Sequence, residues 1–260
     1  MTISPDHGPI QLTGTPEEIH VDGLVLPVLA YHPSAQGRRP AVIVCPGGNA
    51  KGMFEVMEWI SSRLAAAGYL AITLSWRDAS PLNDPLDIGA AVDWLRKRDD
   101  VDPERVGVMG ISRGANAALR AAADDQRLKS VATLGAVTDL LQQSETTAAY
   151  APARNRMLIG WLGDPVANRA FYEQISAVNS VHRITQPTLL IHGAHDMHAP
   201  IEHSIWVKEK MAAAGAPDVE LEVVPMMGHY GDLVPNDFCF GYLGERFIGF
   251  FDRTLSAAAA

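Results

Sequence analysis

The feature that most constrains the fold of this 260-residue chain is the alternation of short apolar segments with amphipathic ones. The apolar segments, which are rich in β-branched residues, are 41–46, 70–76, 105–112, 130–137, 187–193 and 219–225. The amphipathic segments, which carry apolar residues at helical spacing, are 53–67, 84–98, 114–123, 201–214 and 240–255. Strands that are apolar on both faces and alternate with helices indicate a mostly parallel sheet covered by helices on both sides.

Two further segments complete the expected organisation. Residues 17–33 predict two short strands joined at Asp22-Gly23, which is a strong turn signal for a hairpin. Residues 140–186 lie between two predicted strands and have a helical pattern without a strand, so we expect a small helical cap there. Because the chain shows no internal repeat and no low-complexity linker, we predict one α/β domain over residues 1–260.

Composition and charge restrict what the chain binds. It has 21 Lys and Arg against 30 Asp and Glu, a net charge of −9 and no dense basic run, so we expect no nucleic-acid partner. No apolar stretch approaches the ~20 residues of a membrane-spanning helix. The N-terminal residues lack the pattern of a secretion signal, and Cys45 and Cys239 do not suggest a disulfide framework. We therefore expect a cytoplasmic protein without a membrane partner; its oligomeric state stays open, a homodimer included.

The strongest chemical motif is Gly110-Ile111-Ser112-Arg113-Gly114, which matches G-x-S-x-G. It lies where an apolar strand meets an amphipathic helix, the setting that a nucleophile elbow requires. Ser112 would then stand at the carboxyl end of the sheet and at a helix N-terminus, which favours a developing negative charge. The alternative is a glycine-rich strand–helix turn in which the serine has no chemical role.

A serine hydroxyl barely ionises at neutral pH, so a nucleophilic serine needs a general base. Asp196 follows the predicted strand at 187–193, and His229 lies in a loop after the strand at 219–225. This gives the order Ser, Asp, His, in which the aspartate holds and stabilises the histidine ring. The alternatives are that Asp196 caps the helix beginning near Pro200 and that His229 is a surface turn residue.

The loop after the strand at 41–46 begins with Gly47-Gly48. Glycines allow backbone N–H groups to approach a substrate oxygen closely. We predict an oxyanion hole formed by the N–H of Arg113 and that of Gly48, with Asn49 as the alternative to Gly48. A phosphate-binding loop is the competing interpretation, but the G-K-[ST] ending that it needs is missing.

Taken together, these residues resemble the α/β-hydrolase superfamily, in particular its prolyl oligopeptidase and dienelactone hydrolase branch. The segments that carry the resemblance are 46–48, 101–115, 175–200 and 228–232. The resemblance implies Ser112 as nucleophile, Asp196 as acid and His229 as base. Several departures matter. Dienelactone hydrolases carry cysteine where this chain has Ser112, and we expect no room for the β-propeller that restricts prolyl oligopeptidases to peptides. Ala199 stands where the family often has valine before proline, and His195 directly precedes Asp196.

Four histidines invite a metal site; they are His192, His195, His198 and His203. Their spacing fits neither of the common metal-binding patterns, so we expect no metal and no cofactor. We expect His192 to pack at a strand end and the other three to be polar loop residues. We also expect Cys45 to be a buried small hydrophobe, and Arg77 to form a surface salt bridge rather than bind a carboxylate.

The sequence thus predicts a serine hydrolase that cleaves a small to medium carboxylic ester through an acyl-enzyme. The cap at 140–186 should supply an acyl pocket with Met157, Leu158 or Trp161 exposed to substrate, and Tyr230 should also contact it. The alternatives within the fold are an aminoacyl or dipeptidyl peptidase and a thioesterase. The alternative outside catalysis is an inactive member of the fold that binds a ligand.

Overall fold

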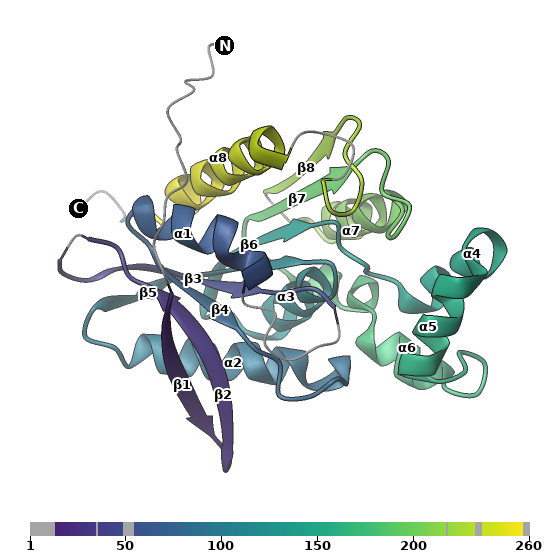
Figure 1. Ribbon diagram of the computed structural model, residues 1–260, viewed down its shortest axis with the longest axis horizontal. Helices are drawn as coiled ribbons and strands as arrows, with labels where there is room; N and C mark the ends of the chain where they lie inside the picture. The colour runs from purple at the N-terminus through teal and green to yellow at the C-terminus, as the bar shows by residue number, and fades with distance from the viewer. Residues whose placement is uncertain (1–13, 35, 49–54, 217, 232–235, 257–260) are drawn as a thin grey trace.

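The computed structural model describes residues 14–34, 36–48, 55–216, 218–231 and 236–256. They contain an eight-stranded sheet with the order β1-β2-β4-β3-β5-β6-β7-β8 (Figure 1). The strands are β1 (Thr15–Val21), β2 (Leu24–Tyr31), β3 (Arg39–Cys45), β4 (Leu70–Leu74), β5 (Val101–Ile111), β6 (Leu128–Leu134), β7 (Thr188–Gly193) and β8 (Val219–Val224). The neighbouring strands β4-β3-β5-β6-β7-β8 run parallel, whereas β2 pairs antiparallel with both β1 and β4. The predicted mostly parallel sheet is therefore confirmed.

Helices cover both faces of this sheet. The flanking helices are α1 (Glu58–Ala66), α2 (Asp84–Arg96), α3 (Arg113–Asp124), α7 (Glu202–Ala213) and α8 (Asn236–Thr254). Helices α2, α3 and α7 share one apolar cluster with Ile43, whereas α1 and α8 share the other with Val42 and Val44. Successive β3 residues therefore point into opposite layers, which is why the strand must be apolar on both faces.

The insert between β6 and β7 forms a separate group of helices beside the sheet (Figure 1). They are α4 (Leu140–Tyr150), α5 (Pro152–Leu162) and α6 (Arg169–Ile175), and the part of the insert that follows them holds two 3₁₀ turns. A third apolar cluster, which includes Val137, Leu162 and Ala199, packs this cap against the loops at the carboxyl end of the sheet. The helical, strand-free insert is as predicted.

Local backbone geometry explains where the elements end. The hairpin turn has φ 49 at Asp22 and φ 76 at Gly23, the two positive values that a tight turn between twisted strands requires. The strand predicted over 130–137 ends earlier, at Leu134, because Gly135 has φ 56 and turns the chain out of the sheet. No helix in the described ranges is both long and apolar enough to cross a membrane.

The side chains of Arg77 and Cys45 both lie away from the open surface. Arg77 pairs with Asp87, whose carboxylate is fully buried, so the predicted surface salt bridge is wrong in its setting although a pair does form. Cys45 is buried as predicted, and this burial raises the pKa of its thiol well above the ordinary value. A thiol held neutral in this way is a packing residue and a poor nucleophile.

Candidate active site

The backbone bends sharply at Ser112, between β5 and α3. Ser112 has φ 56 and ψ −114, values that side-chain-bearing residues rarely adopt. A Cβ on Gly110 would lie 2.1 Å from the carbonyl oxygen of Gly114, and one on Gly114 would lie 2.1 Å from that of Cys45. Both glycines are therefore sterically required, and the strand–turn–helix geometry expected of G-x-S-x-G is present.

Asp196 and His229 form a buried pair at the same end of the sheet. The Nδ1 atom of His229 lies 2.7 Å from Oδ2 of Asp196. The other carboxylate oxygen, Oδ1, accepts the backbone N–H groups of His198 at 2.9 Å and Ala199 at 2.7 Å. Burial alone would raise the pKa of Asp196, but the hydrogen bond and charge of His229 outweigh it, so the pKa lies below its ordinary value. Asp196 is thus held ionised, and it caps a local turn rather than α7.

Gly135 brings this pair close to the bend. The N–H of Ser112 donates to the carbonyl of Leu134 at 3.0 Å, and Gly135 follows directly. A Cβ on Gly135 would lie 3.1 Å from Oδ2 of Asp196 and 3.2 Å from Nδ1 of His229. Among the described residues, the hydrogen bond of Asp196 to His229 is not continued to Ser112. Such bonds often tighten only when substrate is bound.

Two aromatic side chains hold the His229 ring in place. His198 stacks on it with ring centroids 5.3 Å apart and an interplanar angle of 16°. Tyr230 meets the same ring edge-on at 4.9 Å. The sequence predicts His198 only as a polar loop residue. Its position two residues after Asp196, within the turn that Asp196 caps, is the signal that points to a closer role.

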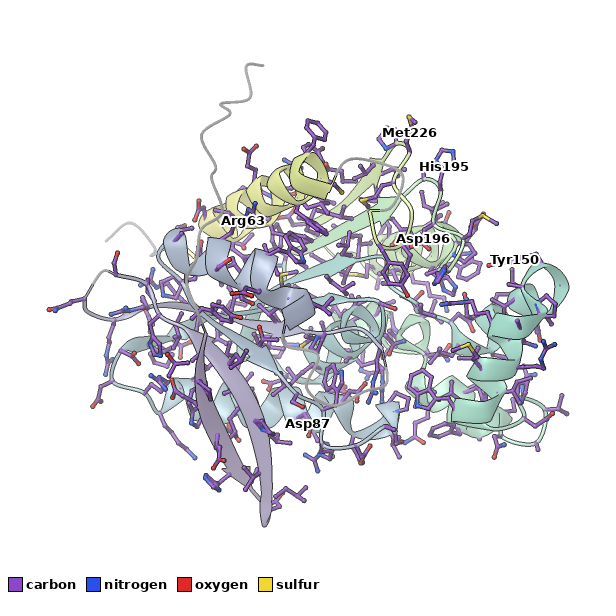
Figure 2. The ribbon with its side chains drawn as sticks, in the orientation of Figure 1. Arg63, Asp87, Tyr150, His195, Asp196 and Met226 are labelled. Carbon is purple, nitrogen blue, oxygen red and sulfur yellow. The ribbon has the colours of Figure 1, made fainter. Side chains whose placement is uncertain are left out.

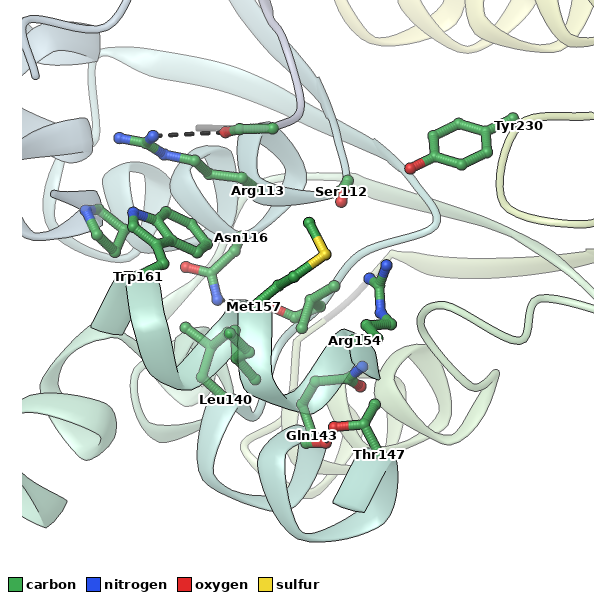
Figure 3. Close-up of a pocket in the computed structure, with 14 residues that line it drawn as sticks. Ser112, Arg113, Asn116, Leu140, Gln143, Thr147, Arg154, Met157, Trp161 and Tyr230 are labelled. Carbon is green, nitrogen blue, oxygen red and sulfur yellow. Dashed lines mark hydrogen bonds between the residues drawn. The ribbon is translucent and has the colours of Figure 1, made fainter. Parts of the chain in front are cut away.

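Arg113 fixes the start of α3 through its side chain. The buried guanidinium donates to Asp84 twice, at 2.8 Å and 2.6 Å, and lies over the rings of Trp76 and Trp161 at 5.2 Å and 5.4 Å. It also donates to the carbonyl of Gly48 at 3.4 Å (Figure 3). The two predicted oxyanion segments are therefore linked directly. Asn49, the alternative donor, lies outside the described residues.

A cavity of about 230 Å³ opens beside Ser112 (Figure 3). Its described lining residues are Gly48, Pro81, Ser112, Arg113, Asn116, Val137, Leu140, Gln143, Thr147, Arg154, Met157, Leu158, Trp161 and Tyr230. All three predicted substrate-binding residues, Met157, Trp161 and Tyr230, border this cavity together with Ser112. Two other methionines, Met57 and Met227, are buried in the core.

The cap is bound to the loop that carries Asp196. Gln143 donates to the carbonyl of His198 at 2.6 Å, and Arg154 lies 2.6 Å from Nδ1 of the same residue. The Tyr150 hydroxyl of α4 donates to the carbonyl of Met197 at 2.9 Å. His195, next to Asp196 in the chain, is exposed at the edge of the molecule (Figure 2). The loop that carries Asp196 and the cap therefore hold each other in position.

The remaining histidines correct one prediction. His192 is buried at the end of β7 as expected, within 2.7 Å of Ser204 Oγ and the carbonyl of Ala199. His203 is not a loop residue: it lies on α7, is buried, and binds the backbone N–H groups of Thr138 and Asp139, both at 3.2 Å. No group of three or more metal-ligating side chains is found among the described residues.

We expect His203 to make the stability of the protein depend on pH. Its Nδ1 accepts two N–H groups, so the folded state holds the neutral ring, and burial lowers its pKa to about 3. In the unfolded chain the pKa returns to ~6.5, so the unfolded state takes up the proton first and stability falls as pH drops below that value. Between pH 7 and pH 5 this contribution is about 2 kcal/mol.

Urea unfolding at pH 7 and pH 5 measures this contribution. The free energy of unfolding should fall by about 2 kcal/mol more in the wild type than in His203→Gln. His182→Gln removes an exposed histidine and should keep the wild-type pH dependence. Equal losses in wild type and His203→Gln would show that His203 does not titrate on unfolding.

The sequence is similar to one known protein family and to several characterised proteins. The sequence profile of the prolyl oligopeptidase family matches residues 74–257. The esterase LipC of Mycobacterium tuberculosis is 26% identical over 217 residues, a match that covers 75% of this chain and 54% of that protein. The chain thus spans about half the length of this relative.

Solved structures match over nearly the whole chain. A puromycin-hydrolysing peptidase of Mycobacterium tuberculosis superposes with a TM-score of 0.83 and 18% identity, covering 98% of this chain and 41% of that one. A truncated carbohydrate esterase from gut microbiota gives a TM-score of 0.75 and 20% identity, covering 95% and 98% of the two chains. At these identities the likeness establishes the fold, which is the α/β-hydrolase fold that the sequence predicts.

Proposed function

Because this chain belongs to the prolyl oligopeptidase family, we propose that it is a serine hydrolase that cleaves small to medium carboxylic esters through an acyl-enzyme at Ser112. The observation that carries the proposal is the buried bond of 2.7 Å between His229 and Asp196, beside a cavity that Ser112 borders. A serine at a strained bend, next to a histidine held by an ionised carboxylate, is the arrangement that activates a hydroxyl for acyl transfer.

In the proposed reaction the Oγ of Ser112 attacks the ester carbonyl while His229 takes the hydroxyl proton. The backbone N–H groups of Arg113 and Gly48 stabilise the negative oxygen that forms. His229 then gives its proton to the departing alcohol, and the acyl group stays on Ser112. A water molecule, deprotonated by His229, attacks the acyl-enzyme. The bond from the acyl carbon to Oγ of Ser112 then breaks, His229 returns the proton to Oγ, and the acid leaves. Asp196 stays ionised throughout and favours the charged form of His229.

The cap favours a small substrate. Its apolar residues Met157, Leu158 and Trp161 line a cavity of about 230 Å³, which suits a short acyl chain rather than a long peptide. An ester has a better leaving group than an amide, so less transition-state stabilisation is required for its cleavage. Both an esterase and a peptidase are among the similar proteins, so a peptidase or thioesterase of the same fold is the main competing proposal. An inactive ligand-binding member of the fold is the competing proposal outside catalysis.

Substitution of Ser112 and of Asp196 tests the proposed mechanism. Ser112→Ala should abolish hydrolysis of short para-nitrophenyl esters because it removes the nucleophile. Asp196→Asn should lower kcat/KM by on the order of 10⁴ because an amide cannot hold His229 in the required tautomer. Asp22→Asn, in the distant hairpin turn, is the matched control and should keep wild-type activity. An Asp196→Asn protein that folds normally and keeps wild-type kcat/KM would refute the role of Asp196.

Matched ester and anilide substrates with the same acyl group test the substrate class. After correction for intrinsic reactivity, kcat/KM should be higher for the ester, and Trp161→Ala should shift the preference towards longer acyl chains because it enlarges the cavity. Trp94→Ala, on α2 and outside the cavity lining, should leave that preference unchanged. Corrected rates that favour aminoacyl anilides would instead support a peptidase.

A further inference from the structure

Arg154 places a positive charge in the wall of the cavity beside Ser112. It lies in the first turn of α5 and lines the cavity together with Ser112 and Tyr230. The guanidinium end of Arg154 points towards the part of the cavity that these two residues border (Figure 3). A charged group at this position lies within reach of a ligand bound in the cavity.

The charges in the described part of the cavity wall are unbalanced. Arg113 also lines it, but its guanidinium is neutralised by the buried carboxylate of Asp84. None of the described lining residues is Asp or Glu. Arg154 donates to Nδ1 of His198 at 2.6 Å, and this contact uses one of the five N–H donors of a guanidinium. Asp196 is already committed to His229 and to two backbone N–H groups.

The position of Arg154 in the helix adds to this imbalance. The N-terminal turn of a helix carries a partial positive charge, so a cation there is unfavourable unless an anion lies nearby. The first turn of α5 contains no acidic residue, and Arg154 is half-buried. An anionic ligand in the cavity would be attracted both by the guanidinium and by the helix terminus.

We propose that Arg154 recognises a carboxylate at the far end of the acyl group, so that the preferred substrates are half-esters of short dicarboxylic acids. The proposal rests on the proposed esterase function. A guanidinium binds a carboxylate through two parallel hydrogen bonds. The apolar side chains of Val137, Leu140 and Met157 line the same cavity and suit the methylene chain that joins the carboxylate to the ester. The substrate then has a reactive carbonyl at Ser112, an apolar middle and an anionic end at Arg154.

The test compares two para-nitrophenyl esters of equal chain length, the half-ester of adipic acid and the corresponding ester of its monoamide. After correction for spontaneous hydrolysis, wild-type kcat/KM should be about 10- to 100-fold higher for the acid than for the amide. The ratio should decrease as ionic strength rises. In Arg154→Met it should fall to about 1, and Arg154→Lys should retain part of it because the charge remains.

The ratio separates recognition from an indirect effect. Loss of the contact between Arg154 and His198 could disturb His229, but that would slow both esters alike and leave their ratio unchanged. Arg156→Met removes an exposed positive charge from the same helix outside the cavity lining, and it should preserve the wild-type ratio. A wild-type ratio near or below 1, or a high ratio that survives in Arg154→Met, would overturn the proposal. Failure of the proposed function itself would differ, because the neutral ester would then not be hydrolysed through Ser112 at all.

Discussion

Because the backbone at Ser112 has φ 56 and ψ −114, β5 passes into α3 within one residue, and neighbouring backbone must approach closely. No side chain fits at Gly110 or Gly114, where a Cβ would lie within 2.1 Å of a carbonyl oxygen. The strain of such a bend is tolerated because β5 lies between β3 and β6 in the sheet and α3 packs on it. The bend places Ser112 at the helix N-terminus. The cap surrounds a cavity that Ser112 borders, and the Asp196–His229 pair lies beside Gly135, close to the bend.

A second interaction links this bend to the cap. The guanidinium of Arg113 is buried and paired with Asp84. It lies over two rings, that of Trp76, which follows β4, and that of Trp161, which belongs to the cap. Breaking one partner of a buried pair leaves an uncompensated charge, which is why such a cluster holds a single arrangement. On the other side of the cavity, Gln143 and Arg154 contact His198, which stacks on His229. The cap is thus connected, through Arg113 and His198, to the surroundings of both Ser112 and His229, so the shape of the cavity and the geometry around these two residues depend on each other.

The sequence predicted the sheet because strands buried on both faces must be apolar throughout, as Val42, Ile43 and Val44 are. It offered Ser112, Asp196 and His229 as a candidate catalytic set, because acyl transfer needs these residue types and α/β-hydrolases carry them in this chain order. It could not predict long-range contacts that no motif marks. His203 depends on backbone N–H groups 65 and 64 residues away, and Asp84 on an arginine 29 residues away. The sequence also does not predict the turn at Gly135, because an apolar run does not reveal a positive φ.

If Ser112 forms a covalent acyl-enzyme, a reagent that reacts with activated serines should label this residue. The folded protein is treated with a fluorophosphonate, and the adduct is located by intact-mass measurement and peptide mapping. We expect a single adduct on Ser112 that is absent from Ser112→Ala and from heat-denatured protein, because only the folded site activates this hydroxyl. Equal labelling of the wild type and Ser112→Ala, or an adduct on another residue, would contradict it.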